Sequence, residues 1–304
     1  MASHHLGTEH LVYAMSPANE PVLRVGSGDT VVVETADCFE NQVQSETQEF
    51  QTINWDHVNP ATGPIYVEGA EKGDLLAVRI QRIEPADHGV MTTGKDMGVF
   101  GDELQENTVR IVPIQAGTVR LLKHSYPVNP MIGVIGTAPE KGAVAGGTPG
   151  EHGGNMDCKL ITQGATLVLP VNVPGALFAL GDMHAAMGDG EVCSTGVEMA
   201  GHITLQLRVL KSRDLPSPFL VDDERVAAIA SAETLDEAAV AATKKMAHWI
   251  VRQTGMMLAE VAMLLSAKGE LRICQVVDPL KTVRMEFPLP WLEQLGVDVQ
   301  KLLA

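Results

Sequence analysis

The stretch from Gly175 to Glu198 reads GALFALGDMHAAMGDGEVCSTGVE. Its first residues form an apolar run that is typical of a buried strand, so the polar groups that follow emerge where a strand ends in a loop. Loops held by a rigid scaffold often carry the chemistry of a protein. The stretch therefore predicts a strand that leads into a functional loop.

Acidic and imidazole side chains are concentrated in this loop. Asp182 and His184 lie two residues apart, which on an extended backbone places both side chains on the same face. An oxygen ligand and a nitrogen ligand could then meet one divalent ion. The same segment holds further carboxylates, which repel one another unless a cation or a shared proton compensates. A solvated Gly-rich turn is the alternative interpretation.

Composition is that of an ordinary globular protein. The 304 residues are 45% hydrophobic and 20% charged, with a formal net charge of -16. An acidic chain is a poor partner for phosphate backbones, which are bound by clustered Lys and Arg. No apolar run approaches the ~20 residues of a membrane span, and the start of the chain lacks the pattern of a signal peptide. We therefore expect a cytoplasmic protein that binds neither nucleic acid nor membrane.

Short strands separated by Gly and Pro turns recur through the first two thirds of the chain. This pattern indicates a mainly β fold, a jelly-roll-like β-sandwich rather than a series of βαβ units. A weak likeness between residues 67–78 and residues 171–180 hints at two similar halves. The predicted strands lie near 22–25, 30–35, 65–67, 75–80, 109–113, 118–122, 131–135, 165–173 and 202–210.

The composition changes after Pro218. Thr234 and Glu237 form the pattern of a capping box, which predicts a helix over 236–253, and a second helix is expected over 256–267. Two strands, near 271–278 and 282–288, follow these helices. We therefore predict a β-sandwich domain over 1–215 and an α+β subdomain over 216–304.

The densest glycine region of the chain runs from Gly133 to Gly154. It lacks the Lys-Ser or Lys-Thr of a phosphate loop, and no helix pattern follows it. Gly153, Gly154 and Asn155 bring backbone N–H groups and an amide together, as an oxyanion or carboxamide pocket requires. A flexible linker is the other interpretation.

The four cysteines are far apart and form no C-x-x-C pair. This spacing disfavours both a structural zinc site and a disulfide framework. Reduced, buried thiols are therefore expected. Only Cys158 and Cys193 lie beside polar loops, where a nucleophilic thiol is a second hypothesis.

Several segments together resemble the acetamidase/formamidase family. The likeness covers nearly the whole chain in order, and its most specific elements are Gly-Gly-Asn-Met-Asp and Gly-Asp-Gly-Glu-Val. Ser194 is a departure, because glycine is expected there. The segments are Asn59–Ala70, Gly133–Pro139, Gly153–Asp157, Gly181–Glu198 and Gln275–Arg284.

This resemblance implies hydrolysis of short aliphatic amides of the acetamide and formamide type to a carboxylate and ammonia. It also implies a jelly-roll-like β domain, a C-terminal subdomain that forms a homodimer or a larger homo-oligomer, and a divalent metal in at least some members. The metal expected here is zinc, with calcium as the alternative. Its expected ligands are Asp182 and His184, with Asp37 or His57 from the first half of the chain.

The remaining roles follow from what amide hydrolysis needs: an activated water, a stabiliser for the oxyanion and an acid for the leaving amine. Glu191 is expected to be the general base and later the acid, and Asp189 and Asp157 to take part in catalysis, Asp157 by binding the NH₂ group. The residues expected to bind substrate are Asn155, Gly153, Gly154 and Thr137.

Three classes of function remain open at the level of sequence. The first is a metal-assisted amidohydrolase, and the second is an amidase with Cys158 or Cys193 as its nucleophile. The third is a non-catalytic β-sandwich that binds a small polar ligand or a metal, or a shell protein built through its helices.

Overall fold

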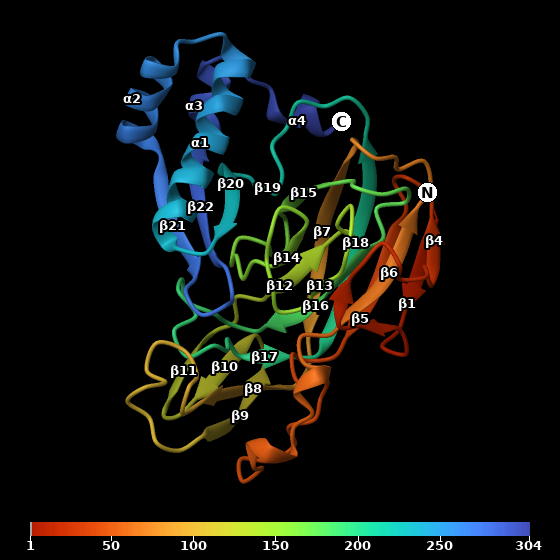
Figure 1. Ribbon diagram of the computed structural model, residues 1–304, viewed down its shortest axis with the longest axis vertical. Helices are drawn as coiled ribbons and strands as arrows, with labels where there is room; N and C mark the ends of the chain where they lie inside the picture. The colour runs from red at the N-terminus through yellow and green to blue at the C-terminus, as the bar shows by residue number, and fades with distance from the viewer. Residues whose placement is uncertain (1) are drawn as a thin grey trace.

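The computed structural model describes residues 2–304. Its largest feature is a pair of sheets, with helices gathered at one end of the molecule (Figure 1). The first sheet has the strand order β1-β5-β18-β7-β15-β19-β20-β22-β21. Its strands are β1 (Ser3–Leu6), β5 (Thr30–Thr35), β7 (Leu75–Pro85), β15 (Thr166–Pro170), β18 (Gly201–Leu210), β19 (Phe219–Val221), β20 (Arg225–Ala232), β21 (Glu270–Gln275) and β22 (Lys281–Pro288).

The second sheet has eleven strands and follows the order β11-β10-β9-β8-β17-β16-β12-β14, with β6 beside β16, and β2 and β4 beside β6. The short strands β3 (Ala14–Met15) and β13 (Val144–Ala145) pair separately. The strands of the second sheet are β2 (Leu11–Val12), β4 (Leu23–Val25), β6 (Ala61–Val67), β8 (His88–Thr93), β9 (Thr108–Gln115), β10 (Thr118–Leu121), β11 (His124–Pro127), β12 (Met131–Gly136), β14 (Gly153–Asn155), β16 (Phe178–His184) and β17 (Glu198–Met199).

The apolar core that joins the two sheets explains why these segments become strands. Val31 and Val33 of β5 alternate with less buried residues, which is the pattern of a strand with one covered face. By contrast, every residue of β12 and β16 is buried, so neither strand alternates between covered and exposed residues. The glycine region around Gly133 is thus a central strand, and the alternative interpretation as a linker is wrong.

The C-terminal helices cover one end of the first sheet (Figure 1). Helix α1 (Leu235–Thr254) begins with the predicted capping box, in which Thr234 and Glu237 each satisfy the backbone of the other. Gly255 ends the helix in the left-handed region with φ 71°. The other helices are α2 (Leu258–Lys268), α3 (Leu289–Gln294) and α4 (Val299–Leu303), with 3-10 turns η1 (Phe50–Thr52) and η2 (Trp55–His57).

The mainly β class and the C-terminal helices are confirmed. The jelly-roll-like arrangement with two similar halves and the division at residue 215 stay predictions. Strands β19 to β22 extend the same sheet that begins with β1, while α1 and its neighbours pack against these strands around a second apolar core centred on Trp249. The two predicted regions therefore share one continuous sheet but have largely separate cores.

Candidate functional site

Strand β16 carries Asp182 and His184 at its end, and the opposite strand β12 makes room for them. Gly133 lies across from Asp182 in the antiparallel register of these strands. A Cβ at Gly133 would lie 2.4 Å from a carboxylate oxygen of Asp182 and 2.4 Å from one of Asp157. Only a glycine lets both carboxylates approach this closely, so the Gly-rich stretch serves packing at the site.

The side chains of Asp182, on the same strand, and of two further segments meet at His184. Its Nε2 atom lies 3.1 Å from Oε2 of Glu198, 3.5 Å from Oδ1 of Asp182 and 3.7 Å from Oδ1 of Asp157. All four side chains are almost completely buried. The loop carboxylates and the imidazole that the sequence singled out are therefore brought together.

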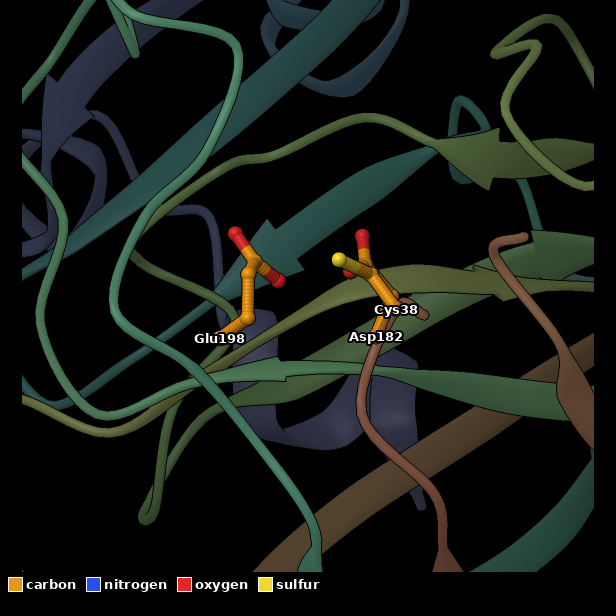
Figure 2. A group of neighbouring side chains, drawn as sticks. All are labelled: Cys38, Asp182 and Glu198. Carbon is orange, nitrogen blue, oxygen red and sulfur yellow. The ribbon is translucent and has the colours of Figure 1, made fainter. Parts of the chain in front are cut away.

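Two groups of ligand-type atoms result from this convergence. The first consists of Cys38, Asp182 and Glu198, whose side chains point toward a common space in Figure 2. The second consists of Asp157, His184 and Glu191. Within each group the ligand atoms lie within 4.8 Å of one another. Two atoms that share an ion at roughly 2.0–2.3 Å lie about 3–4.6 Å apart, so both groups are close to the spacing of a divalent metal site.

Unsatisfied polar atoms indicate that these groups fit a cation. Both carboxylate oxygens of Asp157, both ring nitrogens of His184 and Oε2 of Glu198 are buried and lack a well-aligned hydrogen bond. Buried polar atoms without partners are rare and costly. A thiol and an imidazole among the donors suit zinc better than calcium, which takes oxygen ligands.

Burial and the excess of carboxylates over cations shift the pKa values of the side chains in the cluster. Burial, followed by the charge of Asp157, raises the pKa of Glu191 well above its usual range. Burial also raises the pKa of Glu198, to about 7, although His184 opposes this shift. The pKa of His184 is lowered by burial, but the charges of Glu198 and Asp182 overcome this and raise it well above 6.5. Compensating positive charge is thus what the cluster lacks.

Backbone strain is also concentrated here. Asp157, Asp182 and Glu191 have φ values of 45°, 54° and 47°, in the left-handed region that non-glycine residues seldom adopt. Such conformations persist only where the surroundings impose them, and they cluster at functional sites. Ser194 has φ 67°, which agrees with the expectation of glycine at that position.

Asn155 and Asp278 form the edge of the cluster. The Nδ2 group of Asn155 donates a hydrogen bond of 3.1 Å to Oδ2 of Asp278, while its buried Oδ1 has no partner. Burial and the charge of Glu191 raise the pKa of Asp278 well above its usual range. Asn155 thus presents a free acceptor beside the acidic groups, and Asp278 brings the C-terminal region into the site.

Two of the predicted metal ligands have other contacts. The carboxylate of Asp37 accepts hydrogen bonds from the backbone N–H groups of Phe39 and Asn41, so it stabilises a turn. The ring of His57 is about half exposed, lies 2.8 Å from Oε2 of Glu40 and stacks on Tyr13. Within residues 2–304, neither belongs to a metal-capable group.

Several other predicted site residues are engaged in structural contacts. Asp189 is held by Arg284 and Lys159, which lower its pKa against the effect of burial. The hydroxyl of Thr137 donates to the carbonyl of Pro170. Gly153 and Gly154 lie in β14, paired with β12, and the N–H of Gly153 donates to the carbonyl of Gly150. These contacts favour structural roles for all four.

Sequence reasoning missed three residues of the cluster: Cys38, Glu198 and Asp278. Cys38 and Asp278 follow the ends of β5 and β21 by three residues, and Glu198 begins β17. Their positions near strand ends are the one signal that could have identified them. Cys38 was interpreted as an ordinary buried thiol. Its pKa is raised well above the usual value by burial and by the charges of Glu198 and Asp182.

The two thiols considered as nucleophiles differ in their surroundings. Cys158 is fully buried beside Cys274, and a hydrogen bond from the Cys274 thiol lowers its pKa. Cys193 is partly exposed, and its thiol lies 3.3 Å from the carbonyl oxygen of Thr195. Within residues 2–304, neither thiol forms a hydrogen bond with a histidine.

His152, next to the glycines of β14, gives a pH prediction. Burial lowers its pKa to about 4, so it is neutral in the folded chain. Between pH 6.5 and pH 4 the unfolded chain takes up a proton at this side chain before the folded chain does, so stability is lost as pH falls. We expect the free energy of unfolding, measured with urea at pH 7 and pH 4.5, to fall by about 2–3 kcal/mol more in the parent than in His152→Gln. The same change at exposed His248 is the control, and equal pH sensitivity of parent and His152→Gln would contradict the prediction.

None of the helices in residues 2–304 combines the length and apolar character needed to cross a membrane.

Several known proteins are similar to this chain in sequence and in fold. It is 48% identical to an acetamidase of Bacillus halodurans of known structure, with a TM-score of 0.95, over 96% of this chain and 100% of that one. An acetamidase of Yersinia enterocolitica is 34% identical with a TM-score of 0.90, over 95% of this chain and 93% of that one. A formamidase of Methylophilus methylotrophus is 25% identical over 62% of this chain and 61% of its own length.

The chain spans about three fifths, or less, of the length of the curated relatives it matches, at 61%, 61% and 53%. The sequence profile described as the Acetamidase/Formamidase family matches residues 8–145 and 141–288, which is most of the chain. The chain therefore belongs to the acetamidase/formamidase family.

Proposed function

We propose that this protein hydrolyses linear primary amides of the acetamide and formamide type to a carboxylate and ammonia. The observation that carries the proposal is the buried group of Asp157, His184 and Glu191, whose ligand atoms lie within 4.8 Å of one another. The acetamidases and the formamidase to which the chain is similar support the same reaction.

Glu191 is the proton-transfer group in this proposal. Burial raises the pKa of its carboxyl, which makes Glu191 a stronger base than an exposed carboxylate, so it can take a proton from water and later pass it on. The water oxygen forms a bond to the amide carbon, and its proton moves to Glu191. The C–N bond then breaks, and the proton on Glu191 passes to the leaving nitrogen.

Asn155 and Asp157 orient the amide group. The free Oδ1 of Asn155 accepts a hydrogen bond from the substrate NH₂, because its own Nδ2 is already bound to Asp278. The unpartnered oxygens of Asp157 can accept a second. A divalent metal, zinc in this proposal, would be held by Asp157 and His184, with Cys38, Asp182 and Glu198 beside them, and when bound it would polarise the carbonyl and activate water.

The metal requirement is tested by ammonia release from formamide, acetamide and propionamide. Metal-stripped protein is expected to lose the activity, and protein restored with zinc is expected to regain it. Calcium, supplied to a parallel sample, tests the alternative ion. Undiminished ammonia release from protein shown to be metal-free would overturn the metal-assisted mechanism.

The same assay separates the other two classes. If Cys193 or Cys158 were the nucleophile, iodoacetamide would stop ammonia release and a chelator would not. Cys193→Ser is expected to retain most of the activity. A complete absence of turnover in metal-loaded protein would instead favour a non-catalytic binding protein.

We also propose that the chain forms a homodimer or a larger homo-oligomer through its C-terminal region. Met257 and Met263, on and beside α2, are 65% and 71% exposed. Large apolar side chains exposed to solvent are a feature of interaction surfaces.

A further inference from the structure

A cavity of about 460 Å³ opens beside the acidic cluster. Glu191, whose carboxyl belongs to the cluster, is also part of the cavity wall. Gly196 is another part of the wall, and a Cβ there would lie 2.6 Å from Nδ1 of His184. The cavity is thus separated from the imidazole by a single glycine, and a substrate whose amide reaches Glu191 would place its acyl group in this space.

The wall of the cavity is mostly apolar. Its nonpolar side chains come from β8, from β11 and from the loop after β16; they are Met91, Tyr126, Pro127, Ala186, Met187, Val192 and Val197. The cavity is therefore suited to an apolar group.

Three polar side chains of the wall have partners within the protein. The hydroxyl of Thr195 donates to the carbonyl of Thr92, and the thiol of Cys193 lies against the carbonyl of Thr195. Asp189 is bound to Arg284 and Lys159. Apart from Glu191 and the hydroxyl of Tyr126, Asn129 is the remaining polar side chain of the wall. Few polar groups are thus left to bind a polar acyl chain, and the acidic cluster beside the wall disfavours an anionic one.

The volume also exceeds what the smallest amides need. Cavities of roughly 300–1,000 Å³ commonly hold drug-sized ligands, whereas acetamide has a single methyl group as its acyl tail. We propose that the protein hydrolyses primary amides of uncharged, apolar carboxylic acids longer than propionic acid, with the chain bound in this cavity. This inference rests on the proposed function and extends its substrate class.

The test compares kcat/KM for ammonia release from acetamide, propionamide, butyramide and hexanamide, with metal-restored protein. Each added methylene is expected to raise kcat/KM roughly three- to fourfold, the preference of a methylene for an apolar site, until the cavity is filled. Adipic acid monoamide, which has the same chain length as hexanamide but ends in a carboxylate, is expected to fall at least about tenfold below it.

The outcomes separate this inference from the proposed function. A kcat/KM that falls from propionamide to hexanamide, or equal values for hexanamide and the monoamide, would overturn the inference and leave the amidase in place. No ammonia from any of these amides would overturn both.

Variants of the cavity wall test whether the acyl chain of the substrate binds in the cavity. Ala186→Leu is expected to lower the ratio of kcat/KM for hexanamide to kcat/KM for acetamide about tenfold, because the new side chain occupies part of the cavity. Ala241→Leu, on the exposed face of α1, is the matched control and should change neither value. If Ala186→Leu does not fold, Val192→Asp at the half-exposed rim is expected to lower the ratio of hexanamide to acetamide turnover; an unchanged ratio would count against the inference.

Discussion

Replacing Glu191 by glutamine is expected to lower kcat for amide hydrolysis by about 10²–10⁴-fold, the usual contribution of a general acid–base group. Glutamine keeps the size of the side chain but neither takes up nor releases a proton near neutral pH. Glu191 is buried next to Asp157 and has a raised pKa, so a neutral amide also relieves charge repulsion. The variant should therefore unfold at the same temperature as the parent or a higher one.

This combination separates a catalytic effect from a folding defect. Metal content must be measured beside kcat, because Glu191 also belongs to a metal-capable group. The control is Glu20→Gln at an exposed position, which should match the parent in rate and in melting temperature. A Glu191→Gln protein with normal metal content and full kcat would remove Glu191 from the mechanism.

Replacing Arg284 by methionine is expected to cost about 1.5–3 kcal/mol of folding free energy, because it removes charge-assisted hydrogen bonds to Asp189 and Glu286. These carboxylates keep Lys159 and Arg225 as partners. Arg284 is 2% exposed, and it binds Asp189 with two hydrogen bonds of 2.8 and 2.9 Å. Its Nε donates to Oε1 of Glu286 at 2.7 Å. A planar guanidinium can donate to both carboxylates at once in this geometry, whereas the ammonium group of a lysine cannot. Arg284→Lys should therefore restore only part of the stability.

The same substitution should impair catalysis beyond its effect on stability. Asp189 lies two residues before Glu191, and the backbone of Gly190 is bound to Cys274 and Val276 at the end of β21. Arg284 therefore fixes the loop that carries the proposed base, and kcat in the variant should fall while KM for small amides changes little.

The measurement is urea unfolding together with steady-state kinetics below the unfolding transition. Arg82→Met is the matched control, because Arg82 forms an exposed ion pair with Glu84 and should lose at most about 1 kcal/mol. If Arg284→Met were as stable and as active as the control, the loop would not depend on this ion pair.

Local patterns predicted the elements that depend on neighbouring residues. The capping box of Thr234 and Glu237 and the glycine stop at Gly255 are local signals, and α1 has these ends. The strand end at Asp182 and His184 could also be predicted from the sequence, because an apolar run followed by polar residues is a local pattern.

The composition of the site depended on contacts that local patterns do not encode. The sequence favoured Asp37 as a ligand, but a turn after β5 uses this carboxylate to bind the backbone and brings the neighbouring Cys38 to the cluster. Asp278 was missed because its position depends on long-range pairing, in which Gly190 meets Gln275. Residue chemistry alone cannot reveal such pairing, since the register of distant strands is set by the whole fold.

The continuous sheet that runs from β1 to β21 has a consequence for the synthesis of this protein. Asp278 and Arg284 are translated long after Asp182 and Glu191, and β21 and β22 close one edge of the sheet only when they arrive. A nascent chain synthesised as far as β18 thus already contains most residues of the acidic cluster. It lacks Arg284, which anchors the loop that carries Glu191. Premature stop codons before β22 are therefore expected to yield inactive polypeptides rather than a smaller working enzyme.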